Sequence, residues 1–271
     1  MPVIEAPVSS ADEVLGLVYA KVAARRRNRR RRAVIGSSGT MVLVAGLLSL
    51  LLLGAGGSAS HQATYALPAG LPAGQRHQVL ASLESRYQGF GLSHARTSLR
   101  TQTVTVAWSG GRSSAPRVVA QLGGAGDLSL RPVLGTHRAP CRTTPSVSAD
   151  TQAFEAPGPA GSGQCLELGP AEMTGLRFYS TRAVHGASGW AVGFVVAGPD
   201  AAVFDQVGLN NQGRAVAILV DNRVLSDPVV HNPNFAGRGL ISGRFDQARA
   251  EALALALRYR LPVSLGLLGV D

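Results

Sequence analysis

An uncharged, apolar stretch of 23 residues, from position 33 to position 55, most limits what this chain can fold into. Its middle part, Met41 to Leu53, is almost continuously aliphatic. A helix rises about 1.5 Å per residue, so this stretch extends about 34 Å as a helix, whereas the hydrocarbon core of a bilayer is about 30 Å thick. The sequence therefore predicts one membrane-spanning helix over residues 33–55.

Seven arginines between Arg25 and Arg32 immediately precede the apolar stretch. Arginine-rich segments remain on the cytoplasmic side of a membrane and are attracted to anionic lipid. We therefore expect residues 1–32 to form a cytoplasmic basic tail, with anionic lipid bound at the arginine cluster. The chain is predicted to cross the cell membrane once, with its N-terminus in the cytoplasm and its C-terminal domain outside it.

The arginine cluster and the apolar stretch each have a second interpretation. Basic clusters also bind nucleic acid, but the adjoining apolar span favours the membrane interpretation, and we expect no nucleic-acid partner. A cleaved signal peptide ending at Ser58-Ala59-Ser60 is the alternative for the span. The 32 residues before the stretch are more than a signal peptide usually carries, which favours a retained anchor.

The region after the span predicts a linker followed by a small lobe. Residues 56–75 are rich in Gly, Ala, Ser and Pro, a composition typical of a flexible linker. Residues 76–135 form the expected base lobe, in which apolar residues recur at helical and then at strand spacing. The expected elements are a helix over 75–88, a strand over 103–108, a helix over 116–122 and a strand over 128–133.

Two cysteines, Cys141 and Cys165, lie in or at the end of a segment rich in Pro, Ser, Thr and Gly, residues 136–165. Both lie on the predicted extracytoplasmic side, where an oxidising compartment favours a disulfide. Zinc is the alternative, but the nearest histidines, His137 and His185, do not have the spacing of metal ligands. We predict a long loop closed by a Cys141–Cys165 disulfide, and no metal site.

Residues 166–271 are expected to form the head lobe with a closing helix and strand. Asp221-Asn222 predicts a two-residue hairpin turn, because both residue types tolerate positive φ, and Asp246 predicts the N-cap of an Ala-rich helix. That helix has Ala250, Leu253, Ala254 and Leu257 on its inner face. The other expected elements are a helix after Pro199-Asp200 that presents Val203, Phe204 and Val207 to the core, and strands over 176–182, 190–196, 215–220, 223–225, 240–245 and 261–265. This mixture predicts an α+β fold.

Catalytic motifs are missing from the sequence. G-x-S-x-G, S-x-x-K, H-E-x-x-H and a phosphate-binding glycine loop do not occur. His231 is the most suggestive histidine, but its place after the hairpin is typical of a surface loop. We therefore expect no enzyme, no catalytic residue and no cofactor.

Three segments in the C-terminal part resemble a known family. Ala217 to Val230, AILVDNRVLSDPVV, is similar to the stretch AIVLDGKVISAPVI in the first periplasmic domain of SecD protein-export membrane proteins. Gly239 to Phe245, GLISGRF, is similar to GQISGNF, and Leu261 to Leu265, LPVSL, to LPVPL. Weaker similarity in the same order begins near Gln75. The positions carried over as structural ones are Asp221, Asn222, Pro228, Gly239, Ser242, Gly243, Phe245 and Pro262.

The resemblance implies a ferredoxin-like base lobe plus a mixed α/β head lobe that contacts preproteins emerging from the Sec channel. A complete SecD has six spans, and the later ones contain ionisable groups that couple proton flow to transport. The single span predicted here has no ionisable residue. We therefore expect a membrane-anchored accessory of Sec-dependent export that binds emerging polypeptide or translocon subunits, without a proton-coupled motor. The alternative is a cell-envelope interaction module that kept the fold but not the translocation role.

Overall fold

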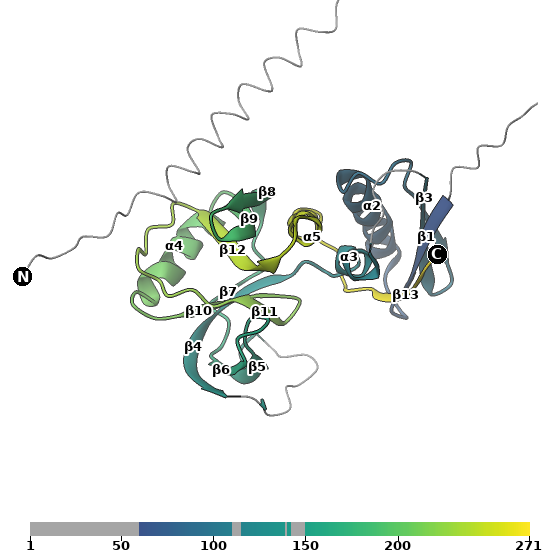
Figure 1. Cartoon of the computed structure of the whole chain (residues 1–271). Coiled ribbons are helices and arrows are strands. Elements are labelled where there is room, and N and C mark those ends of the chain that lie inside the picture. The colour runs from purple at the N-terminus through teal and green to yellow at the C-terminus, as the bar shows by residue number, and fades with distance from the viewer. Residues whose placement is uncertain (1–59, 110–114, 139, 142–149) are drawn as a thin grey trace, which may run out of the picture. The chain divides into compact units, whose positions relative to one another are not determined.

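The computed structural model describes residues 60–109, 115–138, 140–141 and 150–271 (Figure 1). The expected cytoplasmic tail, the expected span over 33–55 and the first residues of the expected linker lie outside these ranges. Among the residues that the structure describes, no helix is both long enough and apolar enough to cross a membrane.

A four-stranded antiparallel sheet and two helices form the base lobe. The strand order is β13-β1-β3-β2, so the last strand of the chain pairs with the first described one. The elements of the base lobe are β1 (Ser60–Ala66), α2 (Ala73–Gly89), β2 (Arg96–Arg100), β3 (Thr103–Ser109), α3 (Pro116–Leu122) and β13 (Gly266–Val270).

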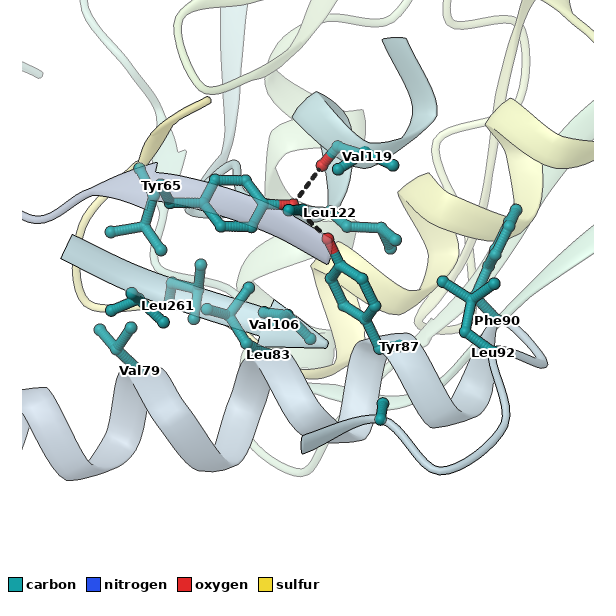
Figure 2. Close-up of a cluster of buried hydrophobic side chains, with 14 of the residues drawn as sticks. Tyr65, Val79, Leu83, Tyr87, Phe90, Leu92, Val106, Val119, Leu122 and Leu261 are labelled. Carbon is teal, nitrogen blue, oxygen red and sulfur yellow. Dashed lines mark hydrogen bonds between the residues drawn. The ribbon is translucent and has the colours of Figure 1, made fainter. Parts of the chain in front are cut away.

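Two buried tyrosines connect the layers of the base lobe (Figure 2). The hydroxyl of Tyr65 on β1 donates to the backbone oxygen of Val119 on α3, at 2.7 Å, and lies 2.7 Å from the hydroxyl of Tyr87 on α2. Both tyrosines are fully buried, and burial raises the pKa of each hydroxyl. The pair therefore satisfies polar groups inside an otherwise apolar core.

Tyr65→Phe should destabilise the fold more than Tyr87→Phe. The first change removes two hydrogen bonds and leaves the Tyr87 hydroxyl without its partner, while the Val119 oxygen keeps only the Gly123 N–H. The second change removes one hydrogen bond. We expect costs of about 2 and about 1 kcal/mol, measured by urea unfolding. The reverse order would contradict this assignment of the network.

The head lobe is inserted between α3 and β13 and contains two sheets. One sheet has the order β11-β10-β4-β6-β5, with β7 also paired to β4, and the other has the order β12-β9-β8. The elements of the head lobe are β4 (Leu128–Arg138), β5 (Phe154–Pro157), β6 (Gln164–Leu168), β7 (Met173–Thr174), β8 (Phe178–Gly186), β9 (Gly189–Val196), α4 (Asp200–Asn210), β10 (Val216–Val220), β11 (Arg223–Ser226), β12 (Arg238–Phe245) and α5 (Gln247–Arg258).

Helix α5 contributes to the cores of both lobes. Its predicted inner face, with Leu253 and Leu257, packs in the head core. Its other face places Ala252 in the base core, with Leu255 packed against it. Small residues on both sides explain why this helix is rich in alanine. The predicted cap is also present, because the Asp246 carboxylate accepts a hydrogen bond from the Arg249 backbone N–H at 2.8 Å.

The structure corrects four expectations from the sequence. Ser60–Ala66 is a strand within the expected linker 56–75, because Ala63 and Tyr65 are buried in the base core. The expected boundary at residue 135 falls inside β4, which belongs to the head lobe. The expected loop 136–165 contains β5 and the start of β6. The closing strand is Gly266–Val270 instead of 261–265, because that later segment pairs with β1.

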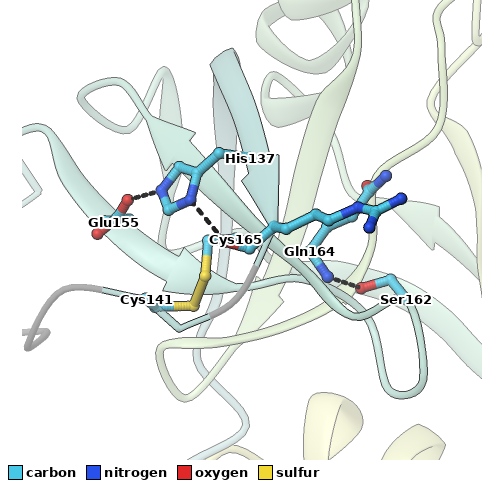
Figure 3. The surroundings of a disulfide bond; sticks show 7 residues. His137, Cys141, Glu155, Ser162, Gln164 and Cys165 are labelled. Carbon is cyan, nitrogen blue, oxygen red and sulfur yellow. Dashed lines mark hydrogen bonds and ion pairs between the residues drawn. A yellow bond between two sulfur atoms is a disulfide. The ribbon is translucent and has the colours of Figure 1, made fainter.

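Cys141 and Cys165 form the expected disulfide, with their Cα atoms 5.4 Å apart (Figure 3). Cys165 lies on β6, directly opposite His137 on β4, so the bridge ties the segment after β4 to the neighbouring strand. Because a bridge between residues 24 positions apart restricts the unfolded chain, reduction should lower the free energy of unfolding by about 3 kcal/mol. Urea unfolding with and without reductant measures this loss. The Cys141→Ser, Cys165→Ser double variant should not respond to reductant.

Candidate functional site

Arg86 joins the two lobes at the points where the chain passes between them. Its side chain is fully buried in the last turn of α2, and all five guanidinium N–H groups donate to backbone oxygens. The acceptors are Tyr259 at 2.7 Å, Leu122 at 2.6 Å, Gly124 at 2.5 Å, Ala125 at 3.1 Å and Ala256 at 3.0 Å.

The charge of Arg86 is balanced by helix ends. Leu122 is the last residue of α3, and Ala256 lies in the last turn of α5, so the cation lies at two negative helix C-termini. Burial lowers the pKa of Arg86 to about 10, and the charge of Asp221 opposes this shift. The guanidinium therefore remains charged at neutral pH. No sequence motif marks this role, although Arg86 follows Val79 and Leu83 on the apolar face of its helix.

The predicted hairpin turn reaches the same junction. Asp221 and Asn222 both have positive φ, at 51° and 62°, as expected for a two-residue turn between β10 and β11. The Asp221 carboxylate accepts hydrogen bonds from the backbone N–H groups of Gly126, at 3.2 Å, and Asp127, at 3.0 Å. The hairpin thus holds the segment that leads from the base lobe into the head lobe.

Strand β12 contains four of the eight positions singled out in the sequence: Gly239, Ser242, Gly243 and Phe245. Asp221 and Asn222 lie in the hairpin, Pro228 accepts a hydrogen bond from the Val216 N–H, and half-buried Pro262 lies between α5 and β13. The structure therefore gathers half of these positions on one strand and distributes the others.

Glycine at two positions lets β12 lie close to its neighbours. A Cβ at Gly239 would lie 2.1 Å from the ring of Phe194 on β9. A Cβ at Gly243 would lie 3.1 Å from the ring of Phe245, beside the irregularity that interrupts the pairing with β9 between Ser242 and Phe245. Both glycines have a packing role, so the similarity at these positions is explained by the fold.

Strand β12 is an edge strand. Within the described ranges it pairs with β9 alone, from Arg238 to Phe245, and contacts β11 near its end. Ile241 points into the core and is fully buried, whereas neighbouring Leu240 is 48% exposed. The strand therefore offers an open edge beside an exposed apolar side chain, which is the arrangement needed to add an extended peptide as a further strand.

The loop before β12 is held against α4. A Cβ at Gly208 on α4 would lie 2.5 Å from the backbone oxygen of Pro233, so only glycine permits this approach. The ring of Phe235 packs 4.8 Å from that of Phe204. Val203, expected on the inner face of α4, is 50% exposed, because the buried face is centred on Phe204, Val207 and Gly208.

A pocket of about 400 Å³ lies elsewhere on the head lobe, beside the disulfide. It is lined by the turn between β5 and β6 together with Cys141, Arg223 and Val224. His231, the histidine of interest in the sequence, is exposed in the loop before β12. The turn that lines the pocket lies close to the end of β12, since a Cβ at Gly161 would lie 2.5 Å from the guanidinium of Arg244.

The head lobe matches a known family. The sequence model described as "SecDF, P1 head subdomain" matches residues 156–263, which cover most of the head lobe from β5 to α5. This match begins in β5 and ends beyond α5, so it includes the hairpin and all of β12. The head lobe is therefore similar to the P1 head subdomain of SecDF.

Individual relatives are similar over shorter segments. The protein translocase subunit SecD of Acetobacter pasteurianus is 41% identical over 69 residues, which are 26% of this chain and 13% of the relative. The protein translocase subunit SecDF of Thermus thermophilus is 34% identical over 101 residues, 36% of this chain and 14% of the relative. The chain thus spans about an eighth of the length of these relatives.

Solved structures extend the likeness in fold to the base lobe. One is described as a membrane component SecDF that enhances protein export. The match covers 78% of this chain and 99% of the solved chain, with a TM-score of 0.55 and 23% sequence identity. The match to SecDF in its super-membrane-facing form covers 78% of this chain and 30% of the solved chain, with a TM-score of 0.58 and 23% sequence identity. The mixed α+β fold is therefore that of SecDF periplasmic domains.

Proposed function

We propose that this chain is a membrane-anchored, SecD-like exoplasmic domain that assists Sec-dependent protein export. It binds an extended segment of emerging polypeptide along the β12 edge of the head lobe. The family match over residues 156–263 links the head lobe to proteins of export, and the open edge of β12 beside exposed Leu240 is the observation that carries the binding mode. Main-chain hydrogen bonds to an edge strand do not depend on the sequence of the bound peptide. A protein that binds many different preproteins needs this independence.

The base lobe positions the head in this proposal. Its element order is strand, helix, strand, strand, helix, strand, with the antiparallel order β13-β1-β3-β2. This connectivity supports a ferredoxin-like base. Arg86 and Asp221 connect that base to the inserted head at both crossings. A pull on bound polypeptide is then transmitted to the base through hydrogen-bonded backbone.

The membrane anchor completes the proposal. The uncharged stretch over residues 33–55 spans the membrane, and the arginine cluster before it binds anionic lipid on the cytoplasmic side. Since that stretch has no ionisable residue, it does not act as a proton-coupled motor. The role proposed for the chain is binding, without catalysis. Translocon subunits are the expected neighbours in the membrane.

Binding of an unfolded secreted protein tests the proposal. The probe is a fluorescently labelled preprotein kept unfolded, titrated with the full chain in detergent. Leu240→Asn should weaken binding several-fold because it removes the exposed apolar contact beside the edge. Leu268→Asn is the matched control, because β13 is also an edge strand with an exposed leucine, 62% exposed, but it lies in the base lobe outside the family match. Equal affinity of the two variants would contradict the β12 site.

The cell-envelope interaction module is the second candidate. It is favoured if the unfolded preprotein does not bind while the head lobe remains folded.

A further inference from the structure

Three side chains of the kinds that bind metal ions meet on three adjacent strands of the larger head sheet. His137 lies on β4, Glu167 on β6 and Glu155 on β5. One donor atom from each lies within 4.8 Å of the other two. The sequence separations of 18 and 12 residues hide this cluster, because only the pairing of the three strands brings the side chains to one face.

The strand register places the two carboxylates directly opposite each other. Glu155 pairs with Glu167 across β5 and β6, and Glu167 pairs with Gly135 across β6 and β4. Like charges in directly opposed positions destabilise a sheet unless a cation lies between them. Gly135 provides the space, since a Cβ there would lie 2.8 Å from the Oε2 atom of Glu167.

The imidazole of His137 is oriented by the backbone oxygen of the next residue, Arg138 (Figure 3). Its Nδ1 atom lies 2.9 Å from the backbone oxygen of Arg138, and its Nε2 atom contacts the Glu155 carboxylate. Metal-binding histidines typically donate one ring N–H to a carbonyl, which fixes the tautomer and leaves the other nitrogen to bind the ion. Nδ1 has such a partner here, and Nε2 faces the carboxylates.

We propose that His137, Glu155 and Glu167 bind one divalent transition-metal ion of the zinc type. Imidazole nitrogen and carboxylate oxygen are zinc ligands, at about 2.0–2.2 Å from the ion. Ligand atoms of a tetrahedral site lie about 3.3–3.6 Å apart on that basis, so a rotation of the glutamate side chains closes the cluster. Water takes the fourth position. The bound ion joins β4, β5 and β6 beside the disulfide, and none of its three ligands lies on β12.

Titration with Co²⁺ followed by Zn²⁺ tests this site. The full chain in detergent is freed of metal with EDTA, which is then removed, and the visible bands of bound Co²⁺ are recorded. We expect one equivalent of Co²⁺ to bind and Zn²⁺ to displace it. His137→Gln should weaken affinity at least about tenfold. The control His231→Gln changes an exposed histidine outside the cluster and should leave affinity unchanged.

Gly135→Ala is the second variant. The added methyl group displaces the flexible Glu167 carboxylate instead of backbone, so the fold is retained while metal affinity falls. Thermal unfolding in EDTA verifies that this variant is as stable as the unchanged chain. The proposal is overturned if the unchanged chain binds no stoichiometric metal, in which case His137 and Glu155 form a simple ion pair. Equal metal affinity of His137→Gln and the unchanged chain would overturn it as well.

Discussion

Arg86→Met should lower the free energy of unfolding by at least about 3 kcal/mol. Methionine fills a similar volume but removes one donor from each of five backbone oxygens, of which the Ala125 oxygen keeps the Leu261 N–H. Each unsatisfied buried polar group costs about 1–3 kcal/mol, and partial relaxation or other partners reduce the sum. The loss should appear in urea unfolding and as faster hydrogen exchange in the segments on both sides of the lobe junction.

Arg76→Met is the matched control for this prediction. Arg76 lies on the same helix, α2, but its side chain is exposed and its Nε donates to the Leu71 backbone oxygen. We expect a change of less than about 0.5 kcal/mol for this surface position. Arg86→Lys should remain strongly destabilised, because an ammonium group cannot reach all five acceptors. A lysine variant as stable as the unchanged chain would mean that charge alone matters at this site.

Gly126→Ala should be the most disruptive glycine substitution in the junction. Gly126 has φ of +75°, and an added Cβ would lie 2.2 Å from the backbone oxygen of Ala256. That oxygen belongs to α5 and also accepts a hydrogen bond from Arg86, so it cannot move without moving both. We expect a loss of at least about 3 kcal/mol, comparable with overpacking of a core, measured by urea unfolding.

A substitution at Gly213 distinguishes the two costs of Gly126→Ala, which are the strain of a positive φ and the close contact with α5. Gly213 has the same φ of +75°, but a Cβ there would meet no atom within 4 Å. Gly213→Ala should therefore cost only the left-handed conformation of alanine, about 1 kcal/mol. If both glycine variants lost the same amount, backbone strain alone would explain Gly126, and the close approach to α5 would have no energetic importance.

Local signals in the sequence predicted much of the fold. The apolar spacing of Val79, Leu83 and Tyr87 predicted α2, and the alternation of Val104, Val106 and Trp108 predicted β3 with its buried face. Asp246 predicted the start of α5. These features are decided within a few residues of the chain, so periodicity and capping were sufficient to find them.

Elements that depend on distant partners were missed. Ser60–Ala66 has the composition of a linker, and it is a strand because β3 and β13 pair with both of its edges. Strands β5 and β6 lie in a segment rich in Pro and Gly, and they form because β6 pairs with β4 and β5 pairs with β6. The cluster of His137, Glu155 and Glu167 also depends on strand register, which no spacing in the sequence reveals.

The candidate site was predicted in part. Similarity to SecD sequences singled out Gly239 and Gly243, and the structure explains both by close packing around β12. Sequence similarity could not indicate that β12 is an edge strand or that Leu240 is exposed, because these properties follow from the order of strands in the sheet. Arg86 had no signal beyond its place on an apolar helix face.

Site-specific photo-crosslinking in the native membrane tests the proposed export role most directly. A photoreactive amino acid replaces Leu240 on β12 or, as a control, Leu268 on β13, since both side chains are exposed. The account predicts adducts with secreted preproteins or channel subunits from position 240, and few or none from position 268. Adducts from position 240 with a single cell-envelope protein, or none above background in a folded chain, would contradict it.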